Sequence, residues 1–455
     1  MSFINDRDSK NKKRRLTVLL STVGLSSLSS FIILVIVVEM VLLSISALLP
    51  FSYAQQQQNV DTDSAPSSCI TYDSTENIIT ISCNSASLTD INKQLNDDTI
   101  LDKEEQQQSD NGEVWLLNAG IIITEDATFY INSTDTKWLK IISDGNTANR
   151  IGVYGSLKID SVKITSWNPE TNDYAITDAK GKIPRPFIIV EDKATGTTDI
   201  TNSELAYLGY AAQLKEDNYA RRSGLAYNGG DGSLIRGNHI HHNMFGFYSK
   251  GVGYIILEDN HVHDNYVYGF DPHTGTHDMI IRNNTVHDEG HIGIICSLDC
   301  YNITIEGNEV YNNADSGIMF SRNMYNSVAR NNYVHDEVKG IFVSASHNNE
   351  IYNNKVSDSG DGIYLKAESS NNKIYDNTII NATSNGILVN TGASDNTFTS
   401  NTIINATELG INVDEDSADN NIFENNKLIN SKVARQEEEG AGEGEEGEEG
   451  EEEDD

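Results

Sequence analysis

The sequence predicts an all-β solenoid, and two recurring landmarks support this prediction. An asparagine recurs every 22 to 25 residues from residue 238 to residue 426. About nine residues after most of these asparagines, a glycine opens a short segment of alternating apolar residues, such as "GIFVS" from Gly340. A unit of this length with short alternating strands and no helical stretch is typical of one coil of a right-handed parallel β-helix. The recurring asparagines are Asn238, Asn260, Asn284, Asn308, Asn332, Asn354, Asn377, Asn401 and Asn426.

The asparagines themselves have a structural interpretation. Successive coils of a β-helix lie about 4.8 Å apart, so equivalent residues stack in ladders. Stacked amides buried at a turn satisfy one another and the turn backbone. We therefore predict one continuous right-handed parallel β-helix over residues 111–432, with Asn238 to Asn426 in a single ladder.

The chain begins with a segment typical of targeting signals. A basic stretch, Lys10 to Arg15, precedes an apolar run that ends near Leu49, and the small residues Ser52 and Ala54 have cleavage-site spacing. Because the apolar run is long, an uncleaved membrane anchor is the alternative. Residues 1–54 are thus a predicted signal peptide or anchor. The protein is expected to be secreted or at the cell surface, with membrane contact only through this segment.

Residues 55–110 are predicted to form an N-terminal segment and cap. Cys69 and Cys83 flank an alternating, hairpin-like stretch, which predicts a disulfide in an oxidising compartment. The region from Leu88 to Leu101 is a candidate capping helix. Cys296 and Cys300 are also close enough to bridge, and no second pair completes a zinc site with them.

Charge limits the classes of partner. The net charge of −36 argues against general binding to nucleic acid or anionic membranes. Part of that charge lies in residues 437–455, which hold 13 carboxylates and no cation. Such a run is typical of a self-repelling tail, so residues 433–455 are predicted to be disordered.

One coil departs from the repeat, at the segment "YGFDPHTGTHD" from Tyr268. Side chains alternate along a strand, so Asp271 and His273 are expected to point outward on one solvent-exposed sheet. On neighbouring coils the equivalent outward positions include Tyr248, Lys250 and Ser297, with Arg322 just beyond the same position two coils on. The predicted groove is lined by Tyr248, Lys250, Tyr268, Asp271 and His273.

All 11 histidines lie between His239 and His347. Several share one repeat position, and they allow two interpretations: a metal ladder or polar binding wall, or a stack of aromatic rings. We favour the stack, because a metal site needs orienting partners that the sequence does not identify. No metal or cofactor is therefore predicted. Calcium is conceivable, but no stack of acidic residues surrounds Asp271. The histidines that share the position are His241, His263, His287 and His335.

The segment "YGFDPH", followed by "THDMIIRNNTVHD" and "GIICS", resembles the mannuronan C5-epimerase family, whose signature contains DPH on a β-helix strand. The resemblance runs from about Gly152 to Asn354 and includes "LKIDSVKITSWNP", "RPFII", "SELAYLGY", "FGFYSK" and "SGIMFSRNMYNSVARNN". It implies an enzyme acting on polyuronates such as alginate, converting mannuronate to guluronate within the polymer. The implied partner is a uronic-acid-containing polysaccharide.

The resemblance also implies residue roles. His273 matches the proposed catalytic base, Asp271 the aspartate beside it, and Tyr268 a tyrosine implicated as an acid; His277 falls on a family histidine. Two positions depart from the periplasmic members of the family. Thr274 replaces the last aspartate of DPHD, and Leu298 stands where those members have an arginine thought to neutralise the substrate carboxylate.

A replacement for that arginine is needed, because the C5 proton is removed more easily once the adjacent carboxylate charge is offset. We expect Lys250 to offset it, since its repeat position lies beside His273. Arg322, two coils away, is expected to serve a neighbouring subsite. The predicted substrate-binding residues are Tyr248, Lys250, His277, Ser297 and Arg322.

The residues leave three functions open. Reprotonation of C5 from the opposite face gives epimerisation, whereas loss of the 4-linked sugar gives a polysaccharide lyase with the same base. A non-catalytic, cell-surface carbohydrate-binding protein is the third possibility, consistent with the acidic tail and the missing arginine.

Overall fold

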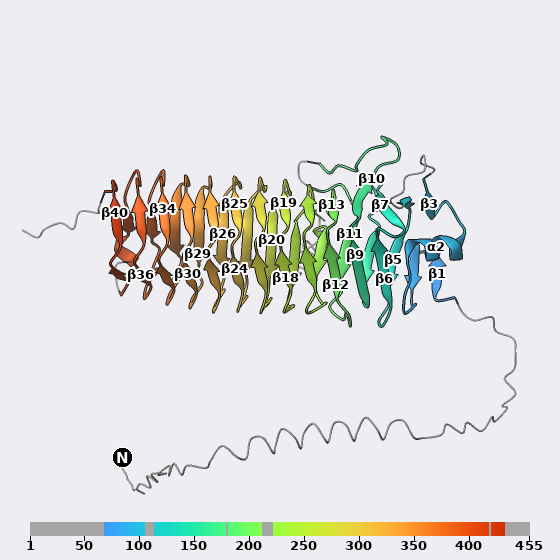
Figure 1. Cartoon of the computed structure of the whole chain (residues 1–455), viewed down its shortest axis with the longest axis horizontal. Coiled ribbons are helices and arrows are strands. Elements are labelled where there is room, and N and C mark those ends of the chain that lie inside the picture. The colour runs from blue at the N-terminus through green and yellow to red at the C-terminus, as the bar shows by residue number, and fades with distance from the viewer. Residues whose placement is uncertain (1–67, 105–112, 179–180, 212–221, 418–419, 433–455) are drawn as a thin grey trace, which may run out of the picture. The chain divides into compact units, whose positions relative to one another are not determined.

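The computed structural model describes residues 68–104, 113–178, 181–211, 222–417 and 420–432. These residues form a right-handed parallel β-solenoid whose strands assemble into three sheets of 14, 14 and 12 strands, here called sheets 1, 2 and 3. Each coil contributes one strand to each sheet in most of the solenoid, and Figure 1 shows the coils stacked along one axis. The predicted fold class is confirmed.

The strands of sheet 1 are β1 (Ile70–Asp73), β2 (Ile78–Ile81), β5 (Gly120–Ile123), β8 (Arg150–Val153), β11 (Phe187–Val190), β14 (Leu225–Tyr227), β17 (Phe247–Lys250), β20 (Tyr268–His273), β23 (Ile292–Ser297), β26 (Ser316–Ser321), β29 (Lys339–Ser344), β32 (Asp361–Lys366), β35 (Ile387–Val389) and β38 (Ile411–Val413). Those of sheet 2 are β3 (Leu101–Lys103), β4 (Glu113–Leu117), β7 (Thr136–Ile142), β10 (Lys163–Trp167), β13 (Glu204–Ala206), β16 (His239–His241), β19 (His261–His263), β22 (Thr285–His287), β25 (Glu309–Tyr311), β28 (Tyr333–His335), β31 (Lys355–Ser357), β34 (Thr378–Ile380), β37 (Thr402–Ile404) and β40 (Lys427–Ile429).

The strands of sheet 3 are β6 (Thr128–Asn132), β9 (Ser156–Asp160), β12 (Thr198–Thr201), β15 (Leu234–Arg236), β18 (Ile256–Glu258), β21 (Ile280–Arg282), β24 (Thr304–Glu306), β27 (Val328–Arg330), β30 (Glu350–Tyr352), β33 (Lys373–Tyr375), β36 (Thr397–Thr399) and β39 (Ile422–Glu424). The helices are α2 (Leu88–Leu95) and the short 3₁₀ helix η2 (Glu415–Ser417).

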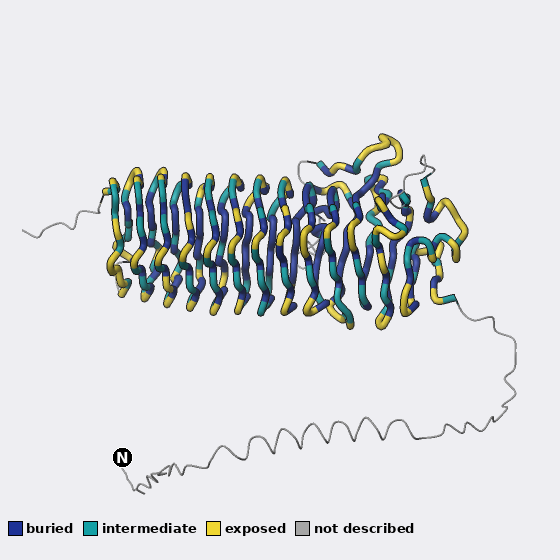
Figure 2. Tube along the Cα trace, in the orientation of Figure 1, coloured by how far each residue is buried: buried dark blue, intermediate teal, exposed yellow. Residues whose placement is uncertain are grey.

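The core is a continuous apolar column inside the coils. Alternation along each strand turns every second residue inward, and in β29 the inward Ile341 and Val343 are fully buried. The strands run through buried positions, while exposed residues gather at the turns (Figure 2). Apolar residues therefore stack from coil to coil within the core.

The predicted asparagine ladder is observed. The backbone N–H of Asn284 donates to Asn308 Oδ1 at 3.0 Å, and Asn308 Nδ2 donates to the carbonyl of Ile281 at 3.0 Å. The same pattern joins every ladder asparagine from Asn238 to Asn426. Each buried amide thus uses both its donor and its acceptor, as buried polar groups require.

A further ladder contains glutamates in place of asparagines. The backbone N–H and Nδ2 of Asn265 donate to the two carboxylate oxygens of Glu289 at 2.9 and 3.0 Å. Asn313 donates in the same way to Glu337 at 3.2 and 2.6 Å. Burial raises the pKa of each glutamate to about 8. Because glutamates alternate with asparagines at this repeat position, the sequence pattern did not reveal the ladder.

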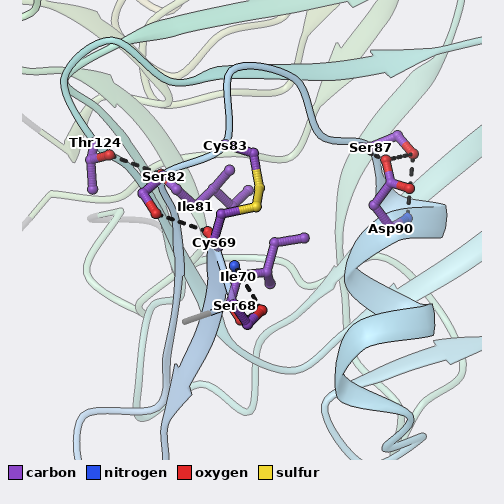
Figure 3. The surroundings of a disulfide bond; sticks show 9 residues. All are labelled: Ser68, Cys69, Ile70, Ile81, Ser82, Cys83, Ser87, Asp90 and Thr124. Atoms are coloured by element: carbon purple, nitrogen blue, oxygen red, sulfur yellow. Dashed lines mark hydrogen bonds between the residues drawn. A yellow bond between two sulfur atoms is a disulfide. The ribbon is translucent and has the colours of Figure 1, made fainter. Parts of the chain in front are cut away.

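The N-terminal end of the described solenoid is closed by a hairpin and a helix. Strands β1 and β2 pair antiparallel, and Cys69 and Cys83 form a disulfide beside them (Figure 3). Helix α2 starts with a capping box in which Ser87 and Asp90 bond each other's backbone N–H (Figure 3). Parallel pairing starts between β2 and β5, ahead of the predicted start at residue 111.

The structure describes the second pair of cysteines, whereas the two predicted terminal segments lie outside the described residues. Cys296 and Cys300 are free, buried thiols, and Cys300 Sγ donates instead to the carbonyl of Ser297 at 3.1 Å. The predicted signal or anchor (residues 1–54) and the predicted acidic tail (433–455) lie outside the described residues. Among the residues that the structure describes, no helix has the length and apolarity needed to cross a membrane.

Candidate active site

The register of sheet 1 brings the predicted site residues together. Strands β17 and β20 pair so that Tyr248 lies opposite Asp271 and Lys250 opposite His273. On the other side of β20, His273 lies opposite Ser297 of β23. Side chains at these positions point away from the solenoid core, because Phe270 of the same strand is in the core.

His273 is held by a threonine and an arginine. Arg322 Nη2 donates to His273 Nε2 at 3.2 Å and to Ser297 Oγ at 2.9 Å. Since a guanidinium can only donate, Nε2 carries the lone pair. The proton of neutral His273 is then on Nδ1, which donates to Thr274 Oγ1 at 2.5 Å. The contacts therefore fix one tautomer and make Nε2 the basic atom.

The electrostatics keep His273 neutral. Burial, Arg322 and Lys250, in that order, lower the pKa of His273 to about 4. At neutral pH Nε2 of the imidazole is therefore unprotonated, which is the form a general base needs, and it accepts the hydrogen bond from Arg322. Lys250 itself is exposed, so its ammonium acts on His273 from the solvent side.

Arg322 lies closer to His273 than the sequence suggested. It follows Ser321, which pairs with Ser297 of the preceding coil, and its backbone is left-handed with φ of 52°. From this turn the extended side chain reaches back across β23 to the imidazole. We expected Arg322 to suit a neighbouring subsite because it lies two coils away; its guanidinium instead contacts His273, because coil spacing alone ignores the length of the side chain.

Asp271 is buried rather than on a solvent-exposed face as expected. It is only 3% exposed, and its Oδ1 has no hydrogen-bond partner. Burial raises the pKa of Asp271 well above its ordinary value, with Arg322 opposing the rise. Burial therefore favours the neutral, protonated form of this carboxyl group. The hydrogen-bond partner of His273 Nδ1 is Thr274.

Apolar residues on the outer face of sheet 1 form a buried cluster, which we call the outer cluster. This cluster shields part of that face from solvent. Tyr248 belongs to it and is 5% exposed. The guanidinium of the buried Arg185 donates to the carbonyls of Gly209, His242 and Leu208 at 2.8 to 3.1 Å, near the cluster members Tyr210 and Met244 in the chain. The members of the outer cluster are Phe187, Ile189, Tyr210, Ala211, Ala226, Met244, Phe245 and Tyr248.

The two site tyrosines have different neighbours. The ring of Tyr248 lies 5.8 Å from the ring of His273. Tyr268, at the start of β20, packs against the outer cluster, with its ring 5.2 Å from Phe245 and 5.6 Å from His291. The ring of Tyr248 thus contacts that of His273, in addition to the substrate-binding role predicted for it.

His277 has its contacts in the turn that follows β20. Its ring stacks on Tyr301 at 5.1 Å and meets the edge of Tyr254 at 5.7 Å. Its Nδ1 bonds Asp278 at 2.8 Å. These contacts continue a ladder of rings along the corner of the solenoid, and the substrate-binding role of His277 stays a prediction.

Thr274 is the residue that sequence reasoning missed. It was noted only as the replacement for an aspartate of the related motif. Its position directly after His273 was the available signal, because a hydroxyl there accepts from Nδ1 as a carboxylate would.

Comparison with known proteins agrees with this architecture. Residues 182–323 and 295–428 match the family described as "Right handed beta helix region". The chain belongs to this family. These two stretches together take up more than half of its length.

Two relatives are of particular interest. The chain is 31% identical over 136 residues to a mannuronan C5-epimerase of Pseudomonas putida, a match covering 28% of this chain and 25% of the relative. The match thus spans about a quarter of that protein. The crystal structure of the periplasmic alginate epimerase AlgG superposes with a TM-score of 0.66 at 21% identity, covering 77% of this chain and 85% of that chain. The second likeness shows the shared fold.

Proposed function

We propose that this protein is a polyuronate-modifying enzyme, and that it epimerises C5 of mannuronate-like residues within a polymer. The observation that carries the proposal is the neutral His273, with its basic Nε2 set against two cations, Arg322 and Lys250. A base beside cations suits a substrate whose reacting carbon is next to a carboxylate. The similarity to a mannuronan C5-epimerase supports the same reaction.

The contacts suggest how substrate binding prepares the base. A uronate carboxylate competes with His273 for the guanidinium of Arg322, because a charge-assisted pair is stronger than a bond to a neutral imidazole. Moving Arg322 onto the carboxylate frees Nε2 and offsets the carboxylate charge. Nε2 then removes the C5 proton, and the arginine stabilises the enolate-like charge that develops.

Return of a proton to the opposite face of C5 completes epimerisation. The ring contact of Tyr248 with His273 makes its hydroxyl one candidate donor, and Tyr268 remains the donor implied by the sequence. Asp271, whose neutral form is favoured by burial, is suited to a further task, since a neutral carboxyl group donates a hydrogen bond to a carboxylate without repelling it. We propose that it assists Arg322 in holding the uronate.

Location and partner follow from the same reasoning. The substrate is a uronic-acid-containing polysaccharide, and such a polymer places the enzyme outside the cytoplasm, at the cell surface or secreted. Likeness to a periplasmic alginate epimerase is consistent with this location.

The test is incubation with polymannuronate in D₂O, followed by NMR. We expect deuterium at C5 of newly formed guluronate, and a loss of at least about 10²-fold in rate for His273→Ala. His347→Gln, which alters a ring stacked on Tyr325 several coils away, is the matched control. Unsaturated uronate ends would indicate a lyase instead. Polymer binding without deuterium uptake, unchanged by His273→Ala, would indicate a carbohydrate-binding protein and refute the enzyme.

A further inference from the structure

A group of histidines on the outer face of sheet 2 has no part in the site described above. The register pairs His239 with His261, and His241 with His263, which in turn pairs with His287. Strands β16, β19 and β22 thus present two adjacent columns of imidazoles. The columns lie on sheet 2, whereas His273 is on sheet 1.

The ring nitrogens of these columns face one another. His239 Nε2 lies 2.6 Å from His263 Nε2, and His261 Nε2 lies 2.7 Å from His287 Nε2. One nitrogen from each of His239, His261 and His263 lies within 4.8 Å of the others. A ring stack requires parallel faces only, and it does not require nitrogens to converge at one point.

Carboxylates orient two of the rings from behind. Asp264 Oδ2 lies 2.7 Å from His263 Nδ1, and Asp288 Oδ2 lies 2.6 Å from His287 Nδ1. Each carboxylate holds the ring proton on Nδ1, so the lone pair of Nε2 points into the group of histidines. A carboxylate behind a histidine is the usual outer partner of metal-bound imidazole. The sequence did not identify these partners, and for that reason it favoured a ring stack.

We propose that His239, His261 and His263 form a binding site for one divalent transition-metal ion of the zinc type. Imidazole nitrogens suit Zn²⁺, which binds them at about 2.0–2.1 Å. Ligand atoms around a tetrahedral ion then lie about 3.3 Å apart. In the structure, His239 Nε2 and His263 Nε2 are 2.6 Å apart, and no two of the three ligand nitrogens are more than 4.8 Å apart. Small ring rotations therefore bring the three nitrogens to the spacing that the ion requires. His287 or water completes the coordination.

Metal binding changes which atoms carry protons. In the metal-free arrangement His239 Nε2–H can donate to His263 Nε2, and His261 Nε2–H to His287 Nε2. An ion replaces these two hydrogen bonds, and His239 and His261 move their remaining proton to Nδ1. The ion joins strands β16 and β19 and therefore stabilises two adjacent coils.

Zinc binding to the untagged full-length chain tests the proposal. Protein stripped of metal is dialysed against Zn²⁺, and bound metal is counted by elemental analysis. We expect one tightly bound ion per chain and a Tm that rises with zinc. His239→Gln and His263→Gln should each abolish the tight site. Asp264→Asn should weaken binding by about 10-fold or more, because it releases the ring of His263.

His335→Gln is the matched control. Its Nδ1 also bonds a carboxylate, Asp336 at 2.6 Å, but its ring stacks on Tyr311 at 4.8 Å outside the histidine group. This variant should keep the tight ion. The proposal is refuted if the wild-type chain binds no ion tightly, or if His239→Gln and His263→Gln leave the stoichiometry unchanged while circular dichroism shows folded protein.

Discussion

Replacing Arg322 with alanine separates its two effects on His273. The guanidinium lies 3.2 Å from Nε2 in the structure, and it is the second-largest cause of the low pKa, after burial. It is also the cation that we place on the substrate carboxylate. Arg322→Ala therefore removes a charge that holds the base neutral and a charge that stabilises the transition state.

The expected magnitudes differ for the two effects. The pKa of His273 is lowered from 6.5 to about 4. Because burial is the larger cause, removing Arg322 raises that pKa by less than about 1.2, or half of the whole change. His273 stays neutral at pH 7 in either case. Any loss of rate at pH 7 thus reports charge stabilisation, and removal of one such donor costs about 10²–10³-fold.

The assay is the pH dependence of kcat/KM, followed by deuterium uptake at C5. The base must be unprotonated, so activity rises with pH through the pKa of His273, near pH 4 in the wild type. In Arg322→Ala this acid limb should move upward, and the plateau should fall by about 10²–10³-fold. Lys250→Ala should move the limb less, because Lys250 is the third cause. An unchanged plateau, or an acid limb that moves down, would contradict the reasoning.

Two further predictions concern stability. Burial raises the pKa of Glu289 from 4.5 to about 8, so the native state disfavours its charge, and stability present below pH 4.5 is lost as pH rises toward 8. Glu289→Gln should therefore remove this pH-dependent loss, about 1.4 kcal/mol per pH unit between pH 4.5 and 8, while costing a constant amount at every pH because its amide accepts only one of the two hydrogen bonds that Asn265 donates; denaturant titration at several pH values checks this against exposed Glu424→Gln. The disulfide of Cys69 and Cys83 spans a separation of 14 residues, so Cys69→Ser with Cys83→Ser should destabilise the cap by about 3 kcal/mol, measured by the same titration. Equal stability with and without the bond would show that the cap is held by its packing alone.

The fold was predictable because its determinants repeat. Every ladder asparagine has the same neighbours in the coils before and after it, so a local pattern reports a long-range contact. Glu289 and Glu337 show the limit of that reasoning. They occupy ladder positions through hydrogen bonds to Asn265 and Asn313, and the change of residue type hides the equivalence.

The site was predictable in membership more than in geometry. Alternation along β20 placed His273 beside Lys250, as the register shows. Burial of Asp271 was not predictable, because alternation places its side chain on the outer face of sheet 1 and does not reveal that an apolar cluster buries part of that face. The contact of Arg322 was missed for a different reason. Coil spacing measures distances between backbones, and a long side chain spans more than one coil.

The position of Arg322 leads to one last prediction. Leu298 follows Ser297, and Arg322 follows Ser321, so the two residues occupy the same turn one coil apart. Both have left-handed backbones, with φ of 60° and 52°, so an arginine fits the turn at residue 298. Related periplasmic epimerases are expected to carry their arginine at this earlier position. If the site needs only a guanidinium near Nε2, Leu298→Arg should restore at least about 10-fold of the rate lost in Arg322→Ala.

Leu298→Lys in the same background is the matched comparison for that rescue. Lysine supplies the charge without the planar fork that can hold Ser297 and a carboxylate together, so it should restore less. Rates of deuterium uptake at saturating polymer would rank the variants. Equal rescue by both residues would show that charge alone matters. No rescue by either would show that a cation at residue 298 cannot replace the guanidinium that Arg322 extends across β23 to His273.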